Sequence, residues 1–90
     1  MERGRSNSWG ARVRRAWIER KAHGTGKVTR REISEMFGVS FPCASHDIAG
    51  VLREAPGSLV YDATEKAYLW GGGEPRLPVP EPIARFRISV

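Results

Sequence analysis

Apolar residues recur at helical spacing in the first quarter of the chain. Intervals of four, three and one separate Trp9, Val13, Ala16 and Trp17. These intervals place the four side chains on one face of an amphipathic helix, with arginines elsewhere on its surface, so residues 9–22 are predicted to be helical. Ser8 precedes the run as a suitable N-cap. Gly24, in the sequence HGTG, is the expected left-handed stop.

A second and a third helix are predicted on either side of a tight turn. Thr29 and Glu32 have the spacing of a capping box at the start of the second helix, which closes at Gly38. Ser40 follows the turn as the N-cap of the third helix, and Pro42 stands in its first turn, where a missing N–H costs little. The third helix is expected to bury positions i, i+4, i+7 and i+8, namely Ala44, Ile48, Val51 and Leu52.

Two short β-prone runs follow the third helix. Residues 59–61 and 67–70 flank the polar turn DATEK, which predicts a hairpin, and residues 27–28 fit one more short strand. Three helices with a tight turn between the last two, followed by a hairpin, describe a winged helix-turn-helix, a mainly α fold with a small β-hairpin. In that fold the third helix enters the major groove of DNA, and its N-terminal residues approach the base edges.

The two ends of the chain are predicted to lie outside the folded domain, which spans residues 9–70. Residues 1–8 are polar and basic and form a flexible arm, whereas residues 71–90 form a linker and tail. The linker begins with three glycines, and its prolines at every second position favour an extended course. Residues 83–90 alternate apolar and polar side chains like a strand. Because a lone strand needs a partner, this tail is a candidate dimer contact.

Positive charge is concentrated at the start of the chain. The net charge is +5, but residues 1–31 hold ten Lys/Arg against two acidic residues, which gives +8. Residues 32–90 hold five against eight, which gives −3. This asymmetry indicates a polyanionic partner such as nucleic acid. The alternative is a charged face that is only solvated.

Other chemistries find little support in the sequence. The longest apolar runs are far shorter than the roughly 20 residues that span a bilayer, and no apolar stretch follows the first arginines as in a signal peptide. One cysteine rules out an internal disulfide and fits a reducing, cytosolic setting. The run GTGK lacks the spacing of a phosphate-binding loop. Cys43 and His46 lack a third group for nucleophilic catalysis, so we expect no catalytic site, metal or cofactor.

The outward side of the predicted third helix is small and mostly neutral. Its positions are Pro42, Cys43, His46, Ala49, Gly50 and Arg53, with Ser45 at the edge. Ala49 and Gly50 would let the helix approach a partner closely. The residues expected to face bases or nearby phosphates are Ser40, Cys43, Ser45 and His46. The residues expected to hold phosphates are Arg30, Arg31, Arg53 and Lys66. Thr29 and Pro42 complete the predicted DNA-binding set.

Several runs of residues resemble the N-terminal winged helix of WYL-domain transcriptional regulators of the BrxR and CapW type, which sit beside phage-defence operons. They are R-x-E-I-S-E-M-F-G-V-S at 30–40, S-x-P-x-A-S-x-D at 40–47, A-P-G-x-L-V-Y-D at 55–62 and K-A-Y at 66–68. The similarity covers roughly residues 9–70. The resemblance implies a homodimer that binds a palindromic operator and represses transcription in the bacterial cytoplasm.

Two departures from that family limit what the resemblance implies. Cys43 stands between Pro42 and Ala44, where a polar side chain such as Gln is expected, so the operator sequence does not follow by analogy. The chain ends at Val90, before the WYL ligand-sensing domain and the C-terminal dimerisation domain. It is therefore expected to be either a stand-alone binder or a fragment, with no small-molecule ligand.

The sequence thus predicts a sequence-specific double-stranded DNA-binding regulator. It would act as a repressor or autoregulator that binds an inverted repeat as a homodimer, blocks a promoter and associates with the nucleoid when bound. One alternative is an excisionase-like architectural factor that uses the same fold to bend DNA. Another is a protein-interaction module that docks a partner on the weakly charged third helix.

Overall fold

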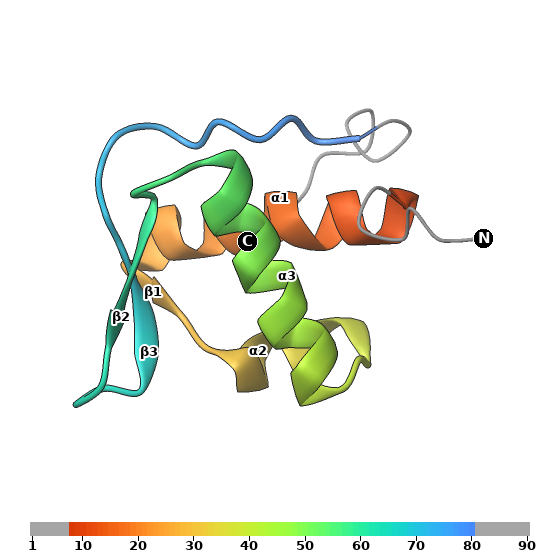
Figure 1. The fold of residues 1–90 in the computed structure, drawn as a ribbon, viewed down its shortest axis with the longest axis horizontal. Helices are drawn as coiled ribbons and strands as arrows, with labels where there is room; N and C mark the ends of the chain where they lie inside the picture. Colours follow the sequence, from red (N-terminus) through yellow and green to blue (C-terminus); the bar gives the residue numbers. More distant parts are fainter. Residues whose placement is uncertain (1–7, 81–90) are drawn as a thin grey trace.

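The computed structural model describes residues 8–80, which form three helices and a small antiparallel sheet (Figure 1). In chain order the elements are α1 (Trp9–Thr25), β1 (Lys27–Val28), α2 (Arg30–Phe37), α3 (Phe41–Glu54), β2 (Leu59–Asp62) and β3 (Ala67–Trp70). This order confirms the predicted fold class. The predicted arm, except Ser8, and the predicted strand at residues 83–90 lie outside the described residues.

Each helix begins where the sequence places a capping side chain. The hydroxyl of Ser8 accepts a hydrogen bond from the N–H of Ala11 at 3.1 Å, and α3 begins in the same way after Ser40. The capping box at α2 is complete, because Thr29 and Glu32 each accept a bond from the other's backbone N–H. These three starts confirm the predictions, since a cap depends only on residues close in sequence.

The end of α1 differs from the prediction. The helix continues through Gly24 to Thr25, and Gly26 is the left-handed residue, with φ of 95°. The backbone N–H of Gly26 donates to the carbonyl of Ala22 at 2.8 Å, and its carbonyl accepts from the N–H of Trp70 at 2.9 Å. Both glycines suit a helix stop. Only Gly26 also connects the helix to the sheet, which explains why the stop lies there.

The hairpin is anchored to the helices by a third strand. The strand order is β1-β3-β2, and both pairings are antiparallel. Tyr68 lies at the centre, opposite Val28 of β1 and Tyr61 of β2. Because β1 connects α1 to α2 directly, the position of the hairpin relative to the helices is fixed by this ladder.

The core lies between the three helices and the sheet. Its buried members are Trp17, Ile18, Ala22, Val28, Ile33, Ala44, Ile48, Val51, Leu59 and Leu77. Trp17 packs edge-on against Phe37 of α2, with ring centroids 5.4 Å apart. Leu52, expected in the buried stripe, is only half-buried, and Trp9 is exposed. On α1 the predicted stripe begins too early at Trp9, and it is too narrow because Ile18 and Ala22 are also buried.

Residues 74–80, which we call the strap, run back along α1 (Figure 1). They contain no helix, as predicted. Leu77 is buried in the core. The fully buried carboxylate of Glu19 accepts hydrogen bonds from the backbone N–H groups of Arg76 and Leu77, at 2.9 and 2.8 Å. Arg20 donates to the carbonyl of Leu77 at 2.9 Å, so the packed part of the chain extends beyond Trp70.

Gly71 is required where the hairpin meets the loop after α3. A Cβ added there would lie 2.0 Å from the carbonyl oxygen of Gly57. We therefore expect Gly71→Ala to lower the free energy of unfolding by about 1–3 kcal/mol. Gly24→Ala is the matched control, because a Cβ there meets no atom within 4 Å and alanine favours the helix by up to about 1 kcal/mol. Urea unfolding measures both, and equal midpoints for the two variants would contradict this packing.

Candidate nucleic-acid interface

The exposed side of α3 forms the centre of the candidate site. Pro42, His46, Ala49 and Arg53 are exposed along it. Ser45 lies half-buried at the edge facing α2, where its hydroxyl accepts a hydrogen bond from Arg30 at 3.3 Å. Ala44, Ile48 and Val51 point into the core. One side of the helix is thus held by packing while the opposite side carries donors, acceptors and one cation.

Two residues that were expected to face outward do not. Gly50 is buried, and a Cβ there would lie 2.7 Å from the Cδ atom of Arg15 on α1. It allows close approach of α1 rather than of an external partner. Cys43 is half-buried, with its sulfur 3.9 Å from a carboxylate oxygen of Asp47. Cys43 therefore lies at the border between the exposed side of α3 and its contact with α1.

Two predicted hydrogen-bonding residues already serve as caps. The hydroxyl of Thr29 accepts from the N–H of Glu32 at 3.1 Å, and that of Ser40 accepts from the N–H of Cys43 at 3.2 Å. A hydroxyl that accepts one bond still has a proton to donate. Thr29 is half-buried and Ser40 is exposed, so Ser40 is the better placed of the two to reach a phosphate.

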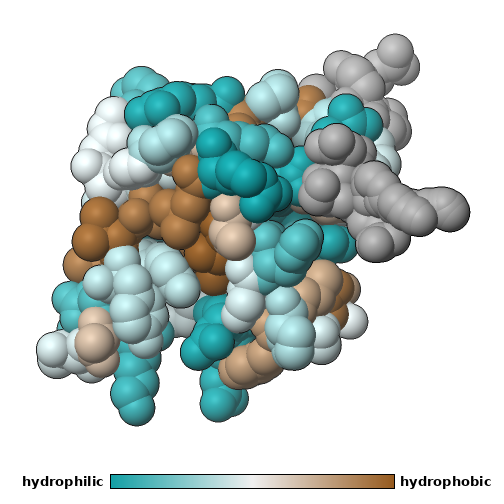
Figure 2. Space-filling view, in the orientation of Figure 1, coloured by the Kyte–Doolittle hydropathy of each residue, from teal (hydrophilic) through white to brown (hydrophobic). Residues whose placement is uncertain are grey.

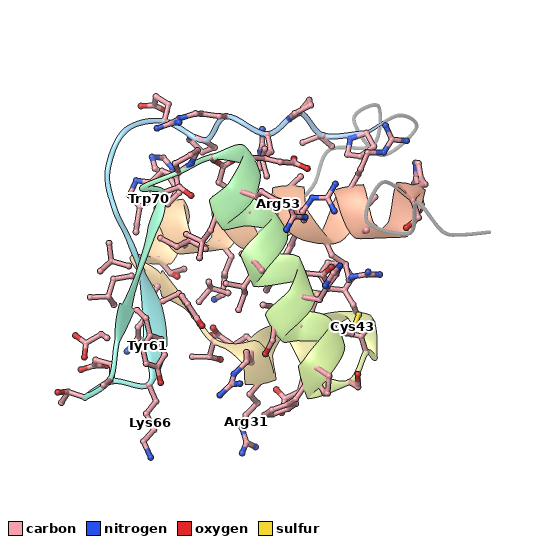
Figure 3. The ribbon with its side chains drawn as sticks, in the orientation of Figure 1. Arg31, Cys43, Arg53, Tyr61, Lys66 and Trp70 are labelled. Atoms are coloured by element: carbon pink, nitrogen blue, oxygen red, sulfur yellow. The ribbon has the colours of Figure 1, made fainter. Side chains whose placement is uncertain are left out.

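Much of the positive charge of the first third is neutralised within the fold. The ion pairs are Arg14–Asp47, Arg15–Glu54, Lys21–Glu32 and Lys27–Glu65. Between residues 8 and 80, no ion pair involves Arg30, Arg31, Arg53 or Lys66. All four are exposed and come from α2, α3 and the hairpin. Arg31 and Lys66 extend from the same side of the molecule in Figure 3, and Arg53 lies on α3. These four cations are therefore available to an external anion.

The hairpin is less acidic than its composition suggests. A hydrogen bond from Lys27 to Glu65, at 2.8 Å, neutralises one carboxylate and raises the pKa of Lys27. The carboxylate of Asp62 accepts from the backbone N–H groups of Thr64 and Glu65, so it closes its own turn. The carboxylates of Glu65 and Asp62 are therefore both engaged within the sheet and its turn.

Two exposed apolar side chains on β2 were missing from the predicted site. Val60 is 56% exposed and Tyr61 is 49% exposed. The ring of Tyr61 packs at a tilt on Tyr68, with centroids 4.9 Å apart. Figure 2 shows a hydrophobic region over the hairpin, on the face that also carries α3. Strand alternation was the available signal for Val60, because Leu59 faces the core and the next residue must face outward. It gave no such signal for Tyr61, which alternation places on the same side as Leu59.

Other kinds of site are not evident in the described part of the chain. Residues 8–80 contain no group of three or more His, Cys, Asp or Glu side chains that could hold a metal ion. No helix among them is long and apolar enough to cross a membrane. The exposed side of α3 with its surrounding cations is therefore the site that the structure supports best.

A comparison with protein families identifies this architecture. A family model described as the BrxR transcriptional regulator winged helix-turn-helix domain matches residues 10–72, which is more than half of the chain. The chain belongs to this family. The matched segment begins in α1 and ends just after β3. The resemblance inferred from residues 9–70 is thereby confirmed.

Curated relatives match most of this chain. The chain is 31% identical over 68 residues to CapW of Escherichia coli (strain KTE188), which is named a DNA-binding transcriptional repressor. It is 32% identical over 60 residues to the CapW protein of Pseudomonas aeruginosa. These matches cover 74% and 67% of this chain but only 23% and 20% of the relatives. The chain therefore spans about a fifth to a quarter of the length of the curated relatives it matches.

Proposed function

We propose that this BrxR-type domain binds double-stranded DNA sequence-specifically and regulates transcription, with α3 in the major groove. The observation that carries the proposal is the exposed side of α3, which is surrounded by cations that no carboxylate in residues 8–80 neutralises. Phosphate contacts from Arg30, Arg31, Arg53 and Lys66 would position the domain. His46 and Ser45 would then read base edges together with the apolar surface of Ala49.

Repression is the regulatory effect that the comparisons favour. The relatives from Escherichia coli and Pseudomonas aeruginosa are both named DNA-binding transcriptional repressors. We propose that this chain likewise blocks a promoter, in the bacterial cytoplasm and associated with the nucleoid, without catalysing a reaction. We also propose a homodimer on an inverted repeat, because two copies related by a twofold axis match such a site.

Binding to the DNA upstream of its own gene, here called the native duplex, tests the proposal. Fluorescence anisotropy would compare this duplex with a scrambled duplex of equal length and composition across a salt series. We expect the native duplex to bind about 10³-fold or more tightly, with log K falling steeply as log salt rises. Equal and weak binding of both duplexes would overturn the proposal.

Two alternative functions predict different outcomes in related measurements. An excisionase-like factor would bind repeated sites beside an attachment sequence and bend them, which circular-permutation gel shifts would detect. A protein-interaction module would show no sequence preference. Its activity would also survive the combined His46→Ala and Arg31→Ala substitutions. A symmetric footprint without bending would favour the repressor over both.

Arg31 provides a test of the phosphate contacts. We expect Arg31→Ala to weaken binding to the native and scrambled duplexes by similar factors and to reduce the salt slope by about 0.9 for each bound copy, because each copy loses one phosphate contact. Arg76→Ala removes the same charge from the strap, on the other side of the molecule from Arg31 (Figure 3). It should leave the slope unchanged. Equal slopes for the wild type and Arg31→Ala would mean that Arg31 does not contact phosphate.

A further inference from the structure

Two successive arginines of α1 contact successive turns of α3. Arg14 donates hydrogen bonds from Nε and Nη2 to the two carboxylate oxygens of Asp47, the second at 3.3 Å. Arg15 runs across Gly50 and places its Nη2 atom 3.3 Å from Glu54. The α1-facing positions of α3 are thus spaced by three and four residues, which is one side of a helix.

The first of these pairs is buried and has a defined geometry. The side chain of Asp47 is 1% exposed and that of Arg14 is 20% exposed. The hydrogen bond to Asp47 is the largest cause that raises the pKa of Arg14, and it outweighs the opposing effect of burial. Two bonds from a planar guanidinium to one carboxylate fix both distance and angle. A point charge or an apolar contact would fix neither.

Apolar packing alone leaves the rotation of α3 weakly specified on this side. The core side of α3 consists of Ala44, Ile48 and Val51, and hydrophobic attraction has no directionality. The α1-facing side is polar, and its one small residue, Gly50, admits the aliphatic part of Arg15. A rotation of α3 that kept the core buried would break the two-bond contact between Arg14 and Asp47.

We propose that Arg14 and Asp47 are positioning residues for base recognition. Their ion pair fixes the rotation and placement of α3, so that Ser45, His46 and Ala49 meet the correct base pairs. This inference rests on the proposed function, and it assigns a role in specificity to two residues outside the DNA-facing surface. Buried ion pairs add little net stability compared with apolar residues of the same shape, whereas they can fix one arrangement.

Two substitutions with opposite effects on charge test the proposal. Arg14→Gln removes a positive charge, and Asp47→Asn removes a negative one. We expect each to weaken binding to the native duplex at least about tenfold, while binding to the scrambled duplex and the salt slope change little. The double variant should be no weaker than either single variant, because one contact is lost in all three. Arg14→Lys keeps the charge but loses the two-bond geometry. It should therefore also reduce the preference for the native over the scrambled duplex.

Other outcomes would overturn the inference. If the pair acted only through the long-range field, Arg14→Gln would weaken binding to both duplexes and Asp47→Asn would strengthen it. If Arg14 itself contacted phosphate, its loss would lower the salt slope and weaken both duplexes alike. The inference would also be overturned if every variant preferred the native duplex as strongly as the wild type does.

Folding and the proposed function are checked separately. Circular dichroism melts would set an assay temperature at which each variant is folded. If Arg14→Gln and Asp47→Asn melt below that temperature, Arg14→Lys is compared with the wild type instead. A wild-type protein that binds both duplexes equally would overturn the proposed function, and this inference with it. If the wild type prefers the native duplex and the variants keep the same preference, this inference alone would be overturned.

Discussion

Ala49→Asp should abolish the preference for the native duplex, a loss of about 10³-fold or more in affinity, while the domain stays folded. Ala49 is exposed on α3 between His46 and Arg53. An aspartate there would place a carboxylate against the acceptor-rich major groove and its phosphates. It would also lose its hydration without gaining a partner, which adds to the cost of binding.

Met36→Asp is the control for this substitution. It adds the same charge at a residue that is 54% exposed, beside Trp17 and Lys21 in the groove between α1 and α2. We expect it to change affinity by less than about threefold, because the new charge lies in a solvent-exposed groove off the exposed side of α3, where salt screens it. Anisotropy titrations at one salt concentration measure both variants. Equal losses for the two would mean that charge alone, and not the exposed side of α3, determines binding.

Local features of this fold were readable from the sequence. The caps at Ser8, Thr29 and Ser40 depend on residues at most three positions away, and all three form as predicted. The stop at Gly26 was missed because two glycines stand two residues apart, and the choice between them depends on pairing with β3, more than forty residues later. Interactions between residues close in sequence therefore identified the helices and strands but not every boundary.

The candidate site was only partly predictable for the same reason. Helical periodicity gave the buried positions of α3 correctly for Ala44, Ile48 and Val51. It could not show that Gly50 is covered, because its neighbour is the aliphatic part of an arginine, which a hydropathy pattern counts as polar. Counting charge likewise could not reveal which cations are paired, since partners such as Arg14 and Asp47 lie 33 residues apart.

The docking of the strap was not predicted at all. The proline-rich composition correctly indicated an extended course, but extended segments carry no signal for what they pack against. Two features were available in retrospect: Leu77 is an apolar residue among prolines, and Glu19 is a carboxylate on the buried side of a helix. A buried carboxylate needs hydrogen-bond donors, and here two backbone N–H groups supply them.

Glu19→Ala should therefore be the most destabilising of the substitutions considered, lowering the free energy of unfolding by roughly 2–4 kcal/mol. It removes the acceptor of two hydrogen bonds and leaves the N–H groups of Arg76 and Leu77 without it at a buried position. Hydrogen bonds to charged groups are worth about 1.5–3 kcal/mol each, and relief of the buried carboxylate offsets part of their loss. Urea unfolding at neutral pH measures the change.

Two further variants separate the strap from the charge. Glu74→Ala removes an exposed carboxylate from the same segment and should change stability by less than about 0.5 kcal/mol. Glu19→Gln retains the oxygen that accepts both bonds, so it should lower the free energy of unfolding less than Glu19→Ala does. If Glu19→Ala were as stable as the wild type and residues 74–80 kept their protection from hydrogen exchange, Leu77 alone would hold the strap. If that protection vanished while α3 stayed protected from hydrogen exchange, the strap would be a separately docked segment whose release leaves α3 intact.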